Sequence, residues 1–488
     1  MNKLRKLTCL LLALMMVFAM TATASAAADT STITAPAGST RTYEVYQIFT
    51  GDLGENNVLS NVKWGQNSKR PEGKNVDDPV DETVLKALTD VNSKPEGERL
   101  TEIEKHVDLS STPIGTVSNG STLSVANGYY LIKDTGEVGA GETYSRYIVN
   151  IVKDITITPK DSKVTFEKKV QDTNDTAGTT TDWQDSADYD IGDFVPFRLT
   201  GTVAEDFMQY TSAYYFAFHD EMEESLDFDK DSVKVYVGNT PITGYTLNST
   251  AHTFDLVFAD LKNVAGVTAG STITVEFKAK LNASANLGNQ GNVNKARLEY
   301  SNKPYDDQKG FTDWDNVIVF TYQVVVKKYA NDIAPEKLKA GAEFTLEKKL
   351  ANGEKTSIAV VKNTEGNTFT FKGLDDGDYI LTETVTPSGF NTIDPIEFTV
   401  TAEHDILWAA QNRDAILTSL SGNAASGVIT FTASEDNGTL STDVINKSGS
   451  TLPETGGMGT TLFYVLGGVL VLAAVVLLVT KKRMRSEN

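Results

Sequence analysis

The sequence predicts an all-β protein of β-sandwich domains in series, with a leader at one end and a membrane-spanning helix at the other. Short runs rich in Val, Ile, Thr, Tyr and Phe alternate with polar residues along most of the 488-residue chain. Turn dipeptides such as Asn119-Gly120 and Asn352-Gly353 separate these runs. Period-two alternation with closely spaced turns is typical of antiparallel sandwiches. Helical periodicity is largely confined to 81–106 and the termini, so we expect little helix elsewhere.

The N-terminus has the pattern of a secretory signal peptide over residues 1–28. A basic start is followed by the apolar run 10–20 and by a small-residue cleavage site that ends at Ala26. Cleavage after Ala28 is the alternative. The single cysteine, Cys9, lies inside this leader. The mature chain therefore has no disulfide, although it is exported to surroundings where disulfides persist.

The C-terminus predicts a membrane-spanning helix. Leu462 to Val479 is an unbroken run of 18 apolar or glycine residues, which is long enough to span a bilayer. A basic tail follows it, and positive charge holds that end in the cytoplasm. Everything that precedes the span is therefore expected outside the cell.

Composition argues against an enzyme or a nucleic-acid-binding protein. The chain has 44 Lys+Arg against 65 Asp+Glu, a formal net charge of −21, which disfavours nucleic acid or an anionic membrane as a partner. Asp227, Asp229 and Asp231 alternate like part of a calcium loop, but its glycine and distal glutamate are missing, so we expect a solvated acidic loop. We expect no metal site and no cofactor, because the histidines are scattered without metal-ligand spacing. They are His106, His219, His252 and His404.

Strand phase predicts two sets of buried polar side chains. In the run 164–170, the valines and Phe166 share one face with Lys168, which is therefore expected to point into the core. By the same rule a carboxyl and a carboxamide lie on apolar faces of two later strands, and a second set follows downstream. The choice within each lysine pair depends only on phase, which one β-bulge would reverse. The sets are Lys168 (or Lys169), Asp220 and Asn294, then Lys328 (or Lys327), Glu383 and Asn446.

A buried lysine, acid and asparagine are the ingredients of an intramolecular isopeptide bond. Burial lowers the pKa of the lysine until the amine is neutral and nucleophilic, and it raises the pKa of the acid so that it stays protonated. The acid then polarises the asparagine carbonyl, and nitrogen leaves as ammonia. We expect Asp220 to assist the Lys168–Asn294 bond and Glu383 to assist the Lys328–Asn446 bond. For one inward lysine alone, the alternative is a side chain that extends to the surface from a sheet edge.

A pentapeptide directly before the apolar span carries the first family resemblance. Pentapeptide, span and basic tail in this order resemble the cell-wall sorting signal of Gram-positive surface proteins. The resemblance implies that a sortase cuts between Thr455 and Gly456, transfers the Thr455 carbonyl to an amine, and leaves the protein attached to peptidoglycan. An ordinary membrane anchor after a chance pentapeptide is the alternative. The motif consists of Leu452, Pro453, Glu454, Thr455 and Gly456.

The first segment resembles the N-terminal domain of Gram-positive shaft pilins, in the stretches 41–51 and 128–134. It ends in Ile157-Thr158-Pro159-Lys160-Asp161, which is similar to the pilin motif Tyr-Pro-Lys-Asn, with Thr158 and Asp161 in place of tyrosine and asparagine. The resemblance implies that Lys160 attacks the sortase-bound threonine of the next subunit. The nearest rival acceptor is Lys163, and a solvated linker lysine is the alternative.

A third resemblance lies near the end of the ectodomain. The stretch 379–390 is similar to the E-box of collagen-adhesin B-type domains, Tyr-x-Leu-x-Glu-Thr-x-x-Pro-x-Gly-aromatic, and Glu383 falls on the catalytic glutamate of that motif. The resemblances together imply three tandem Ig-like β-sandwich domains. The expected order is signal peptide 1–28, N-terminal pilin domain 29–160, middle isopeptide domain 161–322, C-terminal collagen-adhesin B-type domain 323–448 and sorting signal 449–488.

Two functions are compatible with this organisation. The first is the backbone subunit of a sortase-assembled pilus, with Thr455 joined to Lys160 of a neighbour. Its implied partners are further copies of the chain, pilus-specific and housekeeping sortases, tip and base pilins, and peptidoglycan. The second is a monomeric wall-anchored adhesin that binds a host or matrix ligand. A proline-lysine pair at the first domain boundary favours the polymer, because an acceptor amine must be exposed.

Overall fold

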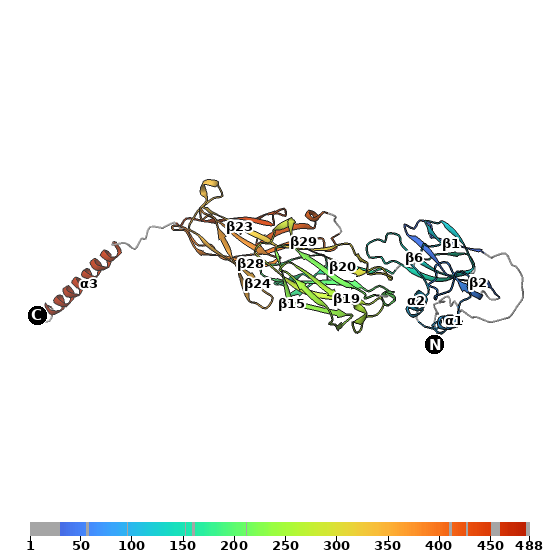
Figure 1. Ribbon diagram of the computed structural model, residues 1–488. Coiled ribbons are helices and arrows are strands. Elements are labelled where there is room, and N and C mark those ends of the chain that lie inside the picture. The colour runs from blue at the N-terminus through green and yellow to red at the C-terminus, as the bar shows by residue number, and fades with distance from the viewer. Residues whose placement is uncertain are drawn as a thin grey trace, which may run out of the picture.

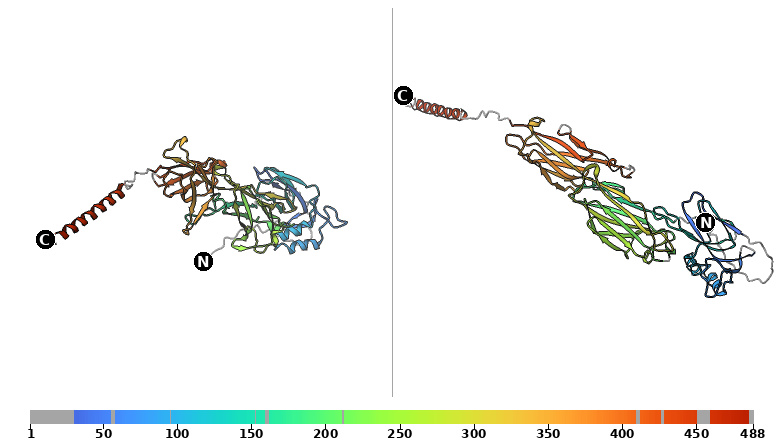
Figure 2. Two further views of the ribbon diagram at one scale, coloured as in Figure 1. Left: turned by 90° about the vertical axis from the view of Figure 1, so that its left-hand side faces the viewer. Right: turned by 45° about the horizontal axis from the view of Figure 1, so that its top comes forward.

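The computed structural model describes residues 30–54, 58–94, 96–151, 153–158, 162–210, 212–408, 412–425, 428–449 and 459–484. Three β-sandwiches follow one another along a rod, and the apolar helix α3 (Gly459–Met484) lies beyond the last of them (Figures 1 and 2). The all-β prediction is confirmed. The expected leader, Pro159 to Asp161 and the pentapeptide 452–456 lie outside the described residues.

The N-terminal sandwich packs a sheet in the order β3-β2-β6-β7, with β4 also on β2, against the sheet β5-β1-β8. Two helices between β3 and β4 pack beside Trp64, the first through Leu85 and Leu88 and the second through Ile103, so the predicted helical segment 81–106 is confirmed. The bounds are β1 (Thr30–Thr34), β2 (Thr42–Leu53), β3 (Leu59–Trp64), α1 (Glu82–Asp90), α2 (Glu96–Glu104), β4 (Gly115–Ser118), β5 (Thr122–Ala126), β6 (Gly128–Asp134), β7 (Arg146–Ile151) and β8 (Ile155–Thr156).

In the middle sandwich, the sheet β16-β15-β19-β13-β9 packs against the sheet β12-β22-β20-β14-β18-β17, in which β21 also pairs with β20. The bounds are β9 (Phe166–Val170), β12 (Ser186–Asp188), β13 (Phe194–Thr202), β14 (Phe216–Met222), β15 (Leu226–Val237), β16 (Thr240–Pro241), β17 (Thr246–Ser249), β18 (Thr253–Phe258), β19 (Thr272–Leu281), β20 (Asn292–Ser301), β21 (Lys309–Phe311) and β22 (Asp315–Phe320). A small hairpin joins β10 (Thr173–Asn174) and β11 (Thr179–Thr180).

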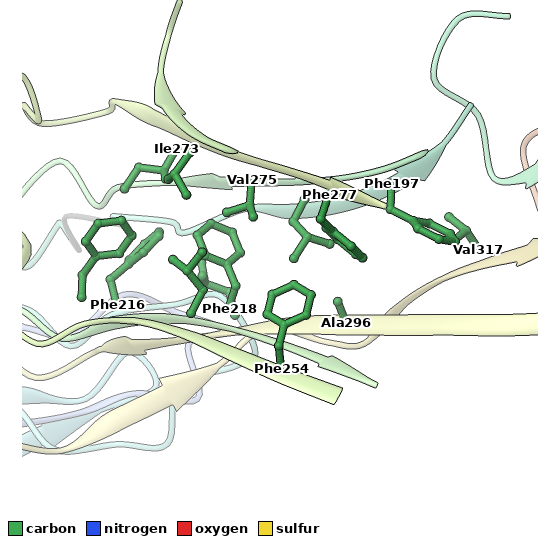
Figure 3. Close-up of a cluster of buried hydrophobic side chains, with 14 of the residues drawn as sticks. Phe197, Phe216, Phe218, Phe254, Ile273, Val275, Phe277, Ala296 and Val317 are labelled. Carbon is green, nitrogen blue, oxygen red and sulfur yellow. The ribbon is translucent and has the colours of Figure 1, made fainter. Parts of the chain in front are cut away.

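Aromatic side chains fill the space between these two sheets. Phe216 and Phe218 rise from one sheet towards Ile273, Val275 and Phe277 of the other (Figure 3). This core follows from strict alternation along β14 and β19.

The acidic stretch was expected to be a solvated loop, but Asp227 and Asp229 lie within strand β15. The intervening Phe228 packs against the core. Asp231 lies at a register shift in the same strand.

The C-terminal sandwich consists of the sheets β26-β27-β23-β32-β31 and β25-β24-β28-β29-β30. Its first strand, β23, pairs in parallel with its last strand, β32. The bounds are β23 (Tyr322–Ala330), β24 (Glu343–Lys349), β25 (Lys355–Ile358), β26 (Val360–Lys362), β27 (Thr368–Leu374), β28 (Gly377–Val385), β29 (Ile396–His404), β30 (Leu417–Ala424), β31 (Phe431–Ser434) and β32 (Thr439–Asn446). Short 3-10 turns are η2 (Phe207–Gln209), η3 (Leu261–Asn263), η4 (Gly288–Gln290), η5 (Pro335–Lys337) and η6 (Arg413–Ala415).

The middle and C-terminal sandwiches share one strand in their packing. On β22, Val317 and Val319 point into the middle core, whereas Ile318 and Phe320 belong to the C-terminal core. Arg413 adds a bidentate ion pair with Glu223, at 2.9 and 3.1 Å, across the same junction. Because side chains of one strand are buried in both cores, we expect these two domains to move as one unit.

Candidate cross-link sites

The first site is a buried lysine and aspartate that face each other across the middle sandwich. Lys168 lies on the edge strand β9 and is fully buried. Its Nζ donates a hydrogen bond to Oδ2 of Asp220, which is on β14 of the opposite sheet. The neighbouring Lys169 points the other way and pairs with Asp185 at 2.7 Å near the surface. Strand phase therefore chose the buried member of this lysine pair.

Asn294 completes this set from the strand next to Asp220. Asp220 pairs in register with Ala296, and Asn294 is two residues before Ala296 on β20, so both side chains point into the same core. Asn294 is fully buried, and its carboxamide lies close enough to Asp220 for a side-chain hydrogen bond that lowers the pKa of that acid. A buried carboxamide needs such a partner, because leaving it unpaired is costly.

Burial dominates the electrostatics of the pair. It lowers the pKa of the Lys168 ammonium, against the attraction of the Asp220 charge. It raises the pKa of Asp220 to about 6, although Lys168 acts in the opposite direction. The rings of Phe197 and Phe277 lie 5.3 and 5.2 Å from Nζ and keep the site apolar. Both shifts move the pair towards the neutral amine and the protonated acid, which are the states that amide formation requires.

The second site joins the first and last strands of the C-terminal sandwich. Lys328 is fully buried on β23, whereas Lys327 is exposed. In the parallel ladder Lys328 is opposite Val444, and Asn446 is two residues beyond on β32. Lys328 Nζ donates to the backbone oxygens of Tyr329 at 3.0 Å and Val444 at 3.4 Å. Burial lowers the pKa of Lys328 to about 8, and the charge of Glu383 opposes this shift.

Glu383 reaches the same site from β28 in the facing sheet. Its Oε2 accepts a hydrogen bond from Asn446 Nδ2 at 2.8 Å and further bonds from Thr386 and Ile393. Asn446 Nδ2 also donates to the Asn391 carbonyl at 2.6 Å. The acid therefore lies on the nitrogen side of the carboxamide. From this position the carboxyl group can relay a proton from the attacking lysine nitrogen to the nitrogen that leaves as ammonia.

A third buried lysine was missed by the sequence reading. Lys348, on β24, shares the inward phase of Phe344 and Leu346, so the rule applied to the other two would also have indicated it. Its Nζ pairs with Asp375 and, at 2.9 Å, with Asp190 of the middle domain. Burial disfavours its charge, but the carboxylates outweigh burial and raise the pKa of Lys348. This lysine is a charged ion-pair residue, in contrast to Lys168 and Lys328.

The expected linking lysine, Lys160, lies outside the described residues. Its nearest described neighbours lie between the N-terminal and middle sandwiches. On one side Ile157 is buried and donates to the Thr34 carbonyl at 2.8 Å. On the other side the rival Lys163 has a side chain that is 62% exposed, with a long ion pair to Glu142 at 3.8 Å. The acceptor role of Lys160 and the acyl role of Thr455 stay predictions.

Within the described residues, one helix is long and apolar enough to cross a membrane. The candidate span is Phe463–Lys482 of α3, and none of it is buried against the rest of the protein.

Two family models match parts of the chain. The SpaA domain, a prealbumin-like fold, matches residues 307–414, and the LPXTG cell wall anchor motif matches residues 445–488.

Comparison with known proteins adds a sequence relative and structures of similar fold. The trypsin-resistant surface T6 protein of Streptococcus pyogenes serotype M6 is 26% identical over 265 residues, 43% of this chain and 48% of that protein, so the alignment spans about half of the relative. The solved structure of the T6 backbone pilin of serotype M6 S. pyogenes, described as a modular three-domain structure, is similar with a TM-score of 0.53 and 19% identity, over 86% of this chain and 98% of that one. The full-length major pilin SpaD of Corynebacterium diphtheriae has a TM-score of 0.49 and 17% identity, over 86% and 97%. The chain is thus a cell-wall-anchored Gram-positive surface protein with the fold of a backbone pilin, in which a SpaA-type prealbumin-like domain precedes the LPXTG anchor.

Proposed function

We propose that this protein is the polymerising backbone subunit of a covalent surface pilus. The observation that carries the proposal is the combination of a cell-wall anchor with a fold that matches a backbone pilin over 98% of its length. A rod of sandwiches with apolar cores, whose sequence shows no recognised catalytic motif, is suited to a structural task. The protein would be a substrate of sortase and not an enzyme with its own turnover.

The linkage step joins one subunit to the next through an amide. Sortase cleaves the peptide bond between Thr455 and Gly456 and holds the Thr455 carbonyl as an acyl enzyme. The amine of Lys160 from a second subunit attacks this carbonyl, the enzyme nucleophile leaves, and the segment that begins at Gly456 has already been released. Transfer of the last Thr455 to a peptidoglycan amine, by a housekeeping sortase, ends the polymer at the wall.

The placement of the two ends supports head-to-tail growth. The described residues that flank Lys160 lie between the first two sandwiches, and the final strand β32 ends at Asn446 in the sandwich furthest from them (Figure 1). Each linkage would therefore place the middle and C-terminal sandwiches of one subunit in line with those of the next. The Lys168–Asn294 and Lys328–Asn446 bonds would tie strands within this line, in a chain that lacks disulfides.

A denaturing gel of cell-wall extract, blotted for this protein, tests the proposal. Wild type should give a high-mass ladder that collapses to monomer in Lys160→Ala. The matched control is Lys163→Ala, which removes the nearest exposed amine and should keep the ladder. A ladder that survives Lys160→Ala but not Lys163→Ala would keep the polymer and move its acceptor. A single monomer band in wild type would overturn the proposal in favour of a monomeric wall-anchored adhesin.

A further inference from the structure

A histidine and two aspartates meet between the middle and C-terminal sandwiches. Asp172 follows β9 and Asp188 ends β12, both in the middle domain, whereas His404 ends β29 in the C-terminal domain. One atom of each lies within 4.8 Å of the others. His404 Nε2 is 3.5 Å from Asp172 Oδ2 and 3.9 Å from Asp188 Oδ1. The side chain of His404 is only 8% exposed.

The hydrogen bonds of Ser186 determine which ring nitrogen of His404 carries the proton when the ring is neutral. The Ser186 hydroxyl donates its one proton to the Asp405 carbonyl oxygen at 2.8 Å. Its oxygen is also 2.6 Å from His404 Nδ1, so it accepts a hydrogen bond from Nδ1–H. In the neutral ring, Nε2 then presents its lone pair to two carboxylates. These groups repel one another unless a cation or a second proton lies between them.

Further polar groups point at the same place. The Tyr322 side chain is fully buried, and its hydroxyl lies beside Asp188, close enough for a side-chain hydrogen bond, and near Asp172. Asp376 adds another carboxylate beside Asp188, which accepts the Asp376 backbone N–H at 3.1 Å. The neighbouring ammonium of Lys348 is already held by Asp375 and Asp190. Several carboxyl groups therefore converge at this place, where burial raises the pKa of Asp188 and of Asp376 and so disfavours their uncompensated charge.

We propose that His404 Nε2, Asp172 and Asp188 form a binding site for a divalent transition-metal ion of the Zn²⁺ type, which ties the middle domain to the C-terminal domain. One imidazole with carboxylates suits Zn²⁺ better than Ca²⁺ or Mg²⁺, which prefer oxygen ligands. A ligating histidine usually donates its other ring N–H to an outer partner, as Nδ1–H does to Ser186. Ser186 is a positioning residue in this site.

A second acidic group at the same junction helps to define the proposal. The carboxyl oxygens of Asp175, Asp190 and Asp193 also lie within 4.8 Å of one another. Lys348 Nζ lies at 3.4 Å from Asp175 and 2.9 Å from Asp190, so an ammonium already neutralises that group. The site at His404 has an imidazole lone pair in place of an ammonium. Of these two groups, only the one at His404 calls for an external cation.

The proposed ion would connect the two domains close to a candidate cross-link. Asp172 is two residues beyond the end of β9, the strand that carries Lys168. His404 ends β29, which pairs with the Glu383 strand β28. Metal ligands from both domains would resist their separation along the rod, in addition to the direct hydrogen bonds of the junction. A protein without disulfides would gain a reversible link in this way.

Titration of the metal-free full chain with ZnCl₂ tests the proposal. The protein is held in detergent micelles, treated with EDTA, dialysed and studied by isothermal titration calorimetry. We expect one saturable Zn²⁺ site, tighter than any for Ca²⁺ or Mg²⁺, and a thermal unfolding midpoint that Zn²⁺ raises and EDTA lowers again. His404→Gln should weaken binding on the order of 100-fold, and Ser186→Ala by roughly 10- to 100-fold.

His219→Gln is the matched control. His219 also lies between two carboxylates, but each ring nitrogen meets its own, Asp255 at 2.6 Å and Glu299 at 3.0 Å. This variant should keep full Zn²⁺ affinity. If His404→Gln does not fold, Asp172→Asn at the more exposed edge of the site should show the same loss. The absence of a saturable site, or unchanged affinity in these variants, would overturn the proposal.

Discussion

Lys168 and Asp220 meet from opposite sheets of the middle sandwich, and both side chains are almost completely shielded from solvent. Their contact joins β9, an edge strand, to β14 in the facing sheet. With Asn294 beside them, an amide between Lys168 and Asn294 would tie the two sheets covalently. In the C-terminal sandwich, Lys328 and Asn446 would tie neighbouring parallel strands of one sheet.

The intact mass of the full chain should be lower than its sequence mass by two ammonia equivalents, because each Lys–Asn amide releases one. Lys168→Ala should restore one equivalent and Lys328→Ala the other, as measured by mass spectrometry of the denatured protein. Lys169→Ala is the control and should keep both losses, since Lys169 pairs with Asp185 near the surface. A wild-type mass without any deficit would rule out both cross-links.

Glu383→Gln should prevent the Lys328–Asn446 bond, because a carboxamide cannot supply the proton that the leaving nitrogen requires. Peptide mapping after proteolysis should then show separate peptides in place of the branched one. The Lys168–Asn294 branch should remain, since Asp220 serves that site. The control is Glu397→Gln, because Glu397 is the exposed ion-pair partner of Lys349, and it should change neither branched peptide. A persistent branched peptide in Glu383→Gln would show that the glutamate is dispensable.

Loss of the C-terminal cross-link should lower stability markedly. A tie between Lys328 on β23 and Asn446 on β32 closes a loop of roughly 120 residues, for which restriction of the unfolded chain predicts about 4 to 5 kcal/mol. Lys328→Ala should therefore lower the thermal unfolding midpoint, as measured by calorimetry, and increase cleavage by trypsin. The exposed neighbour Lys327 provides the control variant Lys327→Ala, which should unfold like wild type. Equal midpoints for both variants would contradict the prediction.

A chain without this cross-link should become more stable as the pH rises from about 8 towards the ordinary lysine value. In Asn446→Ala, Lys328 stays free, and burial lowers its pKa to about 8 in the folded state. Above that pH the folded state has lost a proton that the unfolded state still binds, so the free energy of unfolding rises with pH. Below it both states are protonated, and the penalty of burying the charge is constant.

Denaturant midpoints of Asn446→Ala between pH 7 and 10 would measure this slope, with roughly constant values expected at the lower end. The double variant Lys328→Met/Asn446→Ala lacks the titrating amine and is the matched control for all other groups. Its midpoint should show a weaker rise over the same range. Identical pH profiles for the two proteins would show that Lys328 has an ordinary pKa.

Removal of the junction lysine should destabilise the rod. Lys348→Met leaves Asp375 and Asp190 buried without their cation, and breaking one side of a buried ion pair costs about 3 to 5 kcal/mol. The surface pair of Lys349 and Glu397, at 2.8 Å, offers the control Lys349→Met, for which less than about 1 kcal/mol is expected. Denaturant unfolding of the two variants measures the difference. A small effect of Lys348→Met would indicate that the aspartates take up protons instead.

Much of the candidate chemistry could be predicted from local sequence, because side chains of a strand alternate between faces. That rule alone separates Lys168 from Lys169 and Lys328 from Lys327, and it places Glu383 inward. The apolar span and the anchor motif are likewise contiguous in sequence and needed no structure. Strand phase also applies to Lys348, but it says only that the side chain is buried and not which groups surround it.

The sequence grouped these side chains into two sets, and only the tertiary structure shows which contacts bring each set together. Lys168 and Asp220 meet because β9 and β14 lie in opposite sheets, and Lys328 lies near Asn446 because the first and last strands of a domain pair in parallel. Asp172, Asp188 and His404 show no metal-ligand spacing, since the domain junction brings them together from two separate folds. Periodicity within a strand determines the direction of a side chain, whereas contacts between distant strands depend on topology and domain packing, which no local pattern encodes.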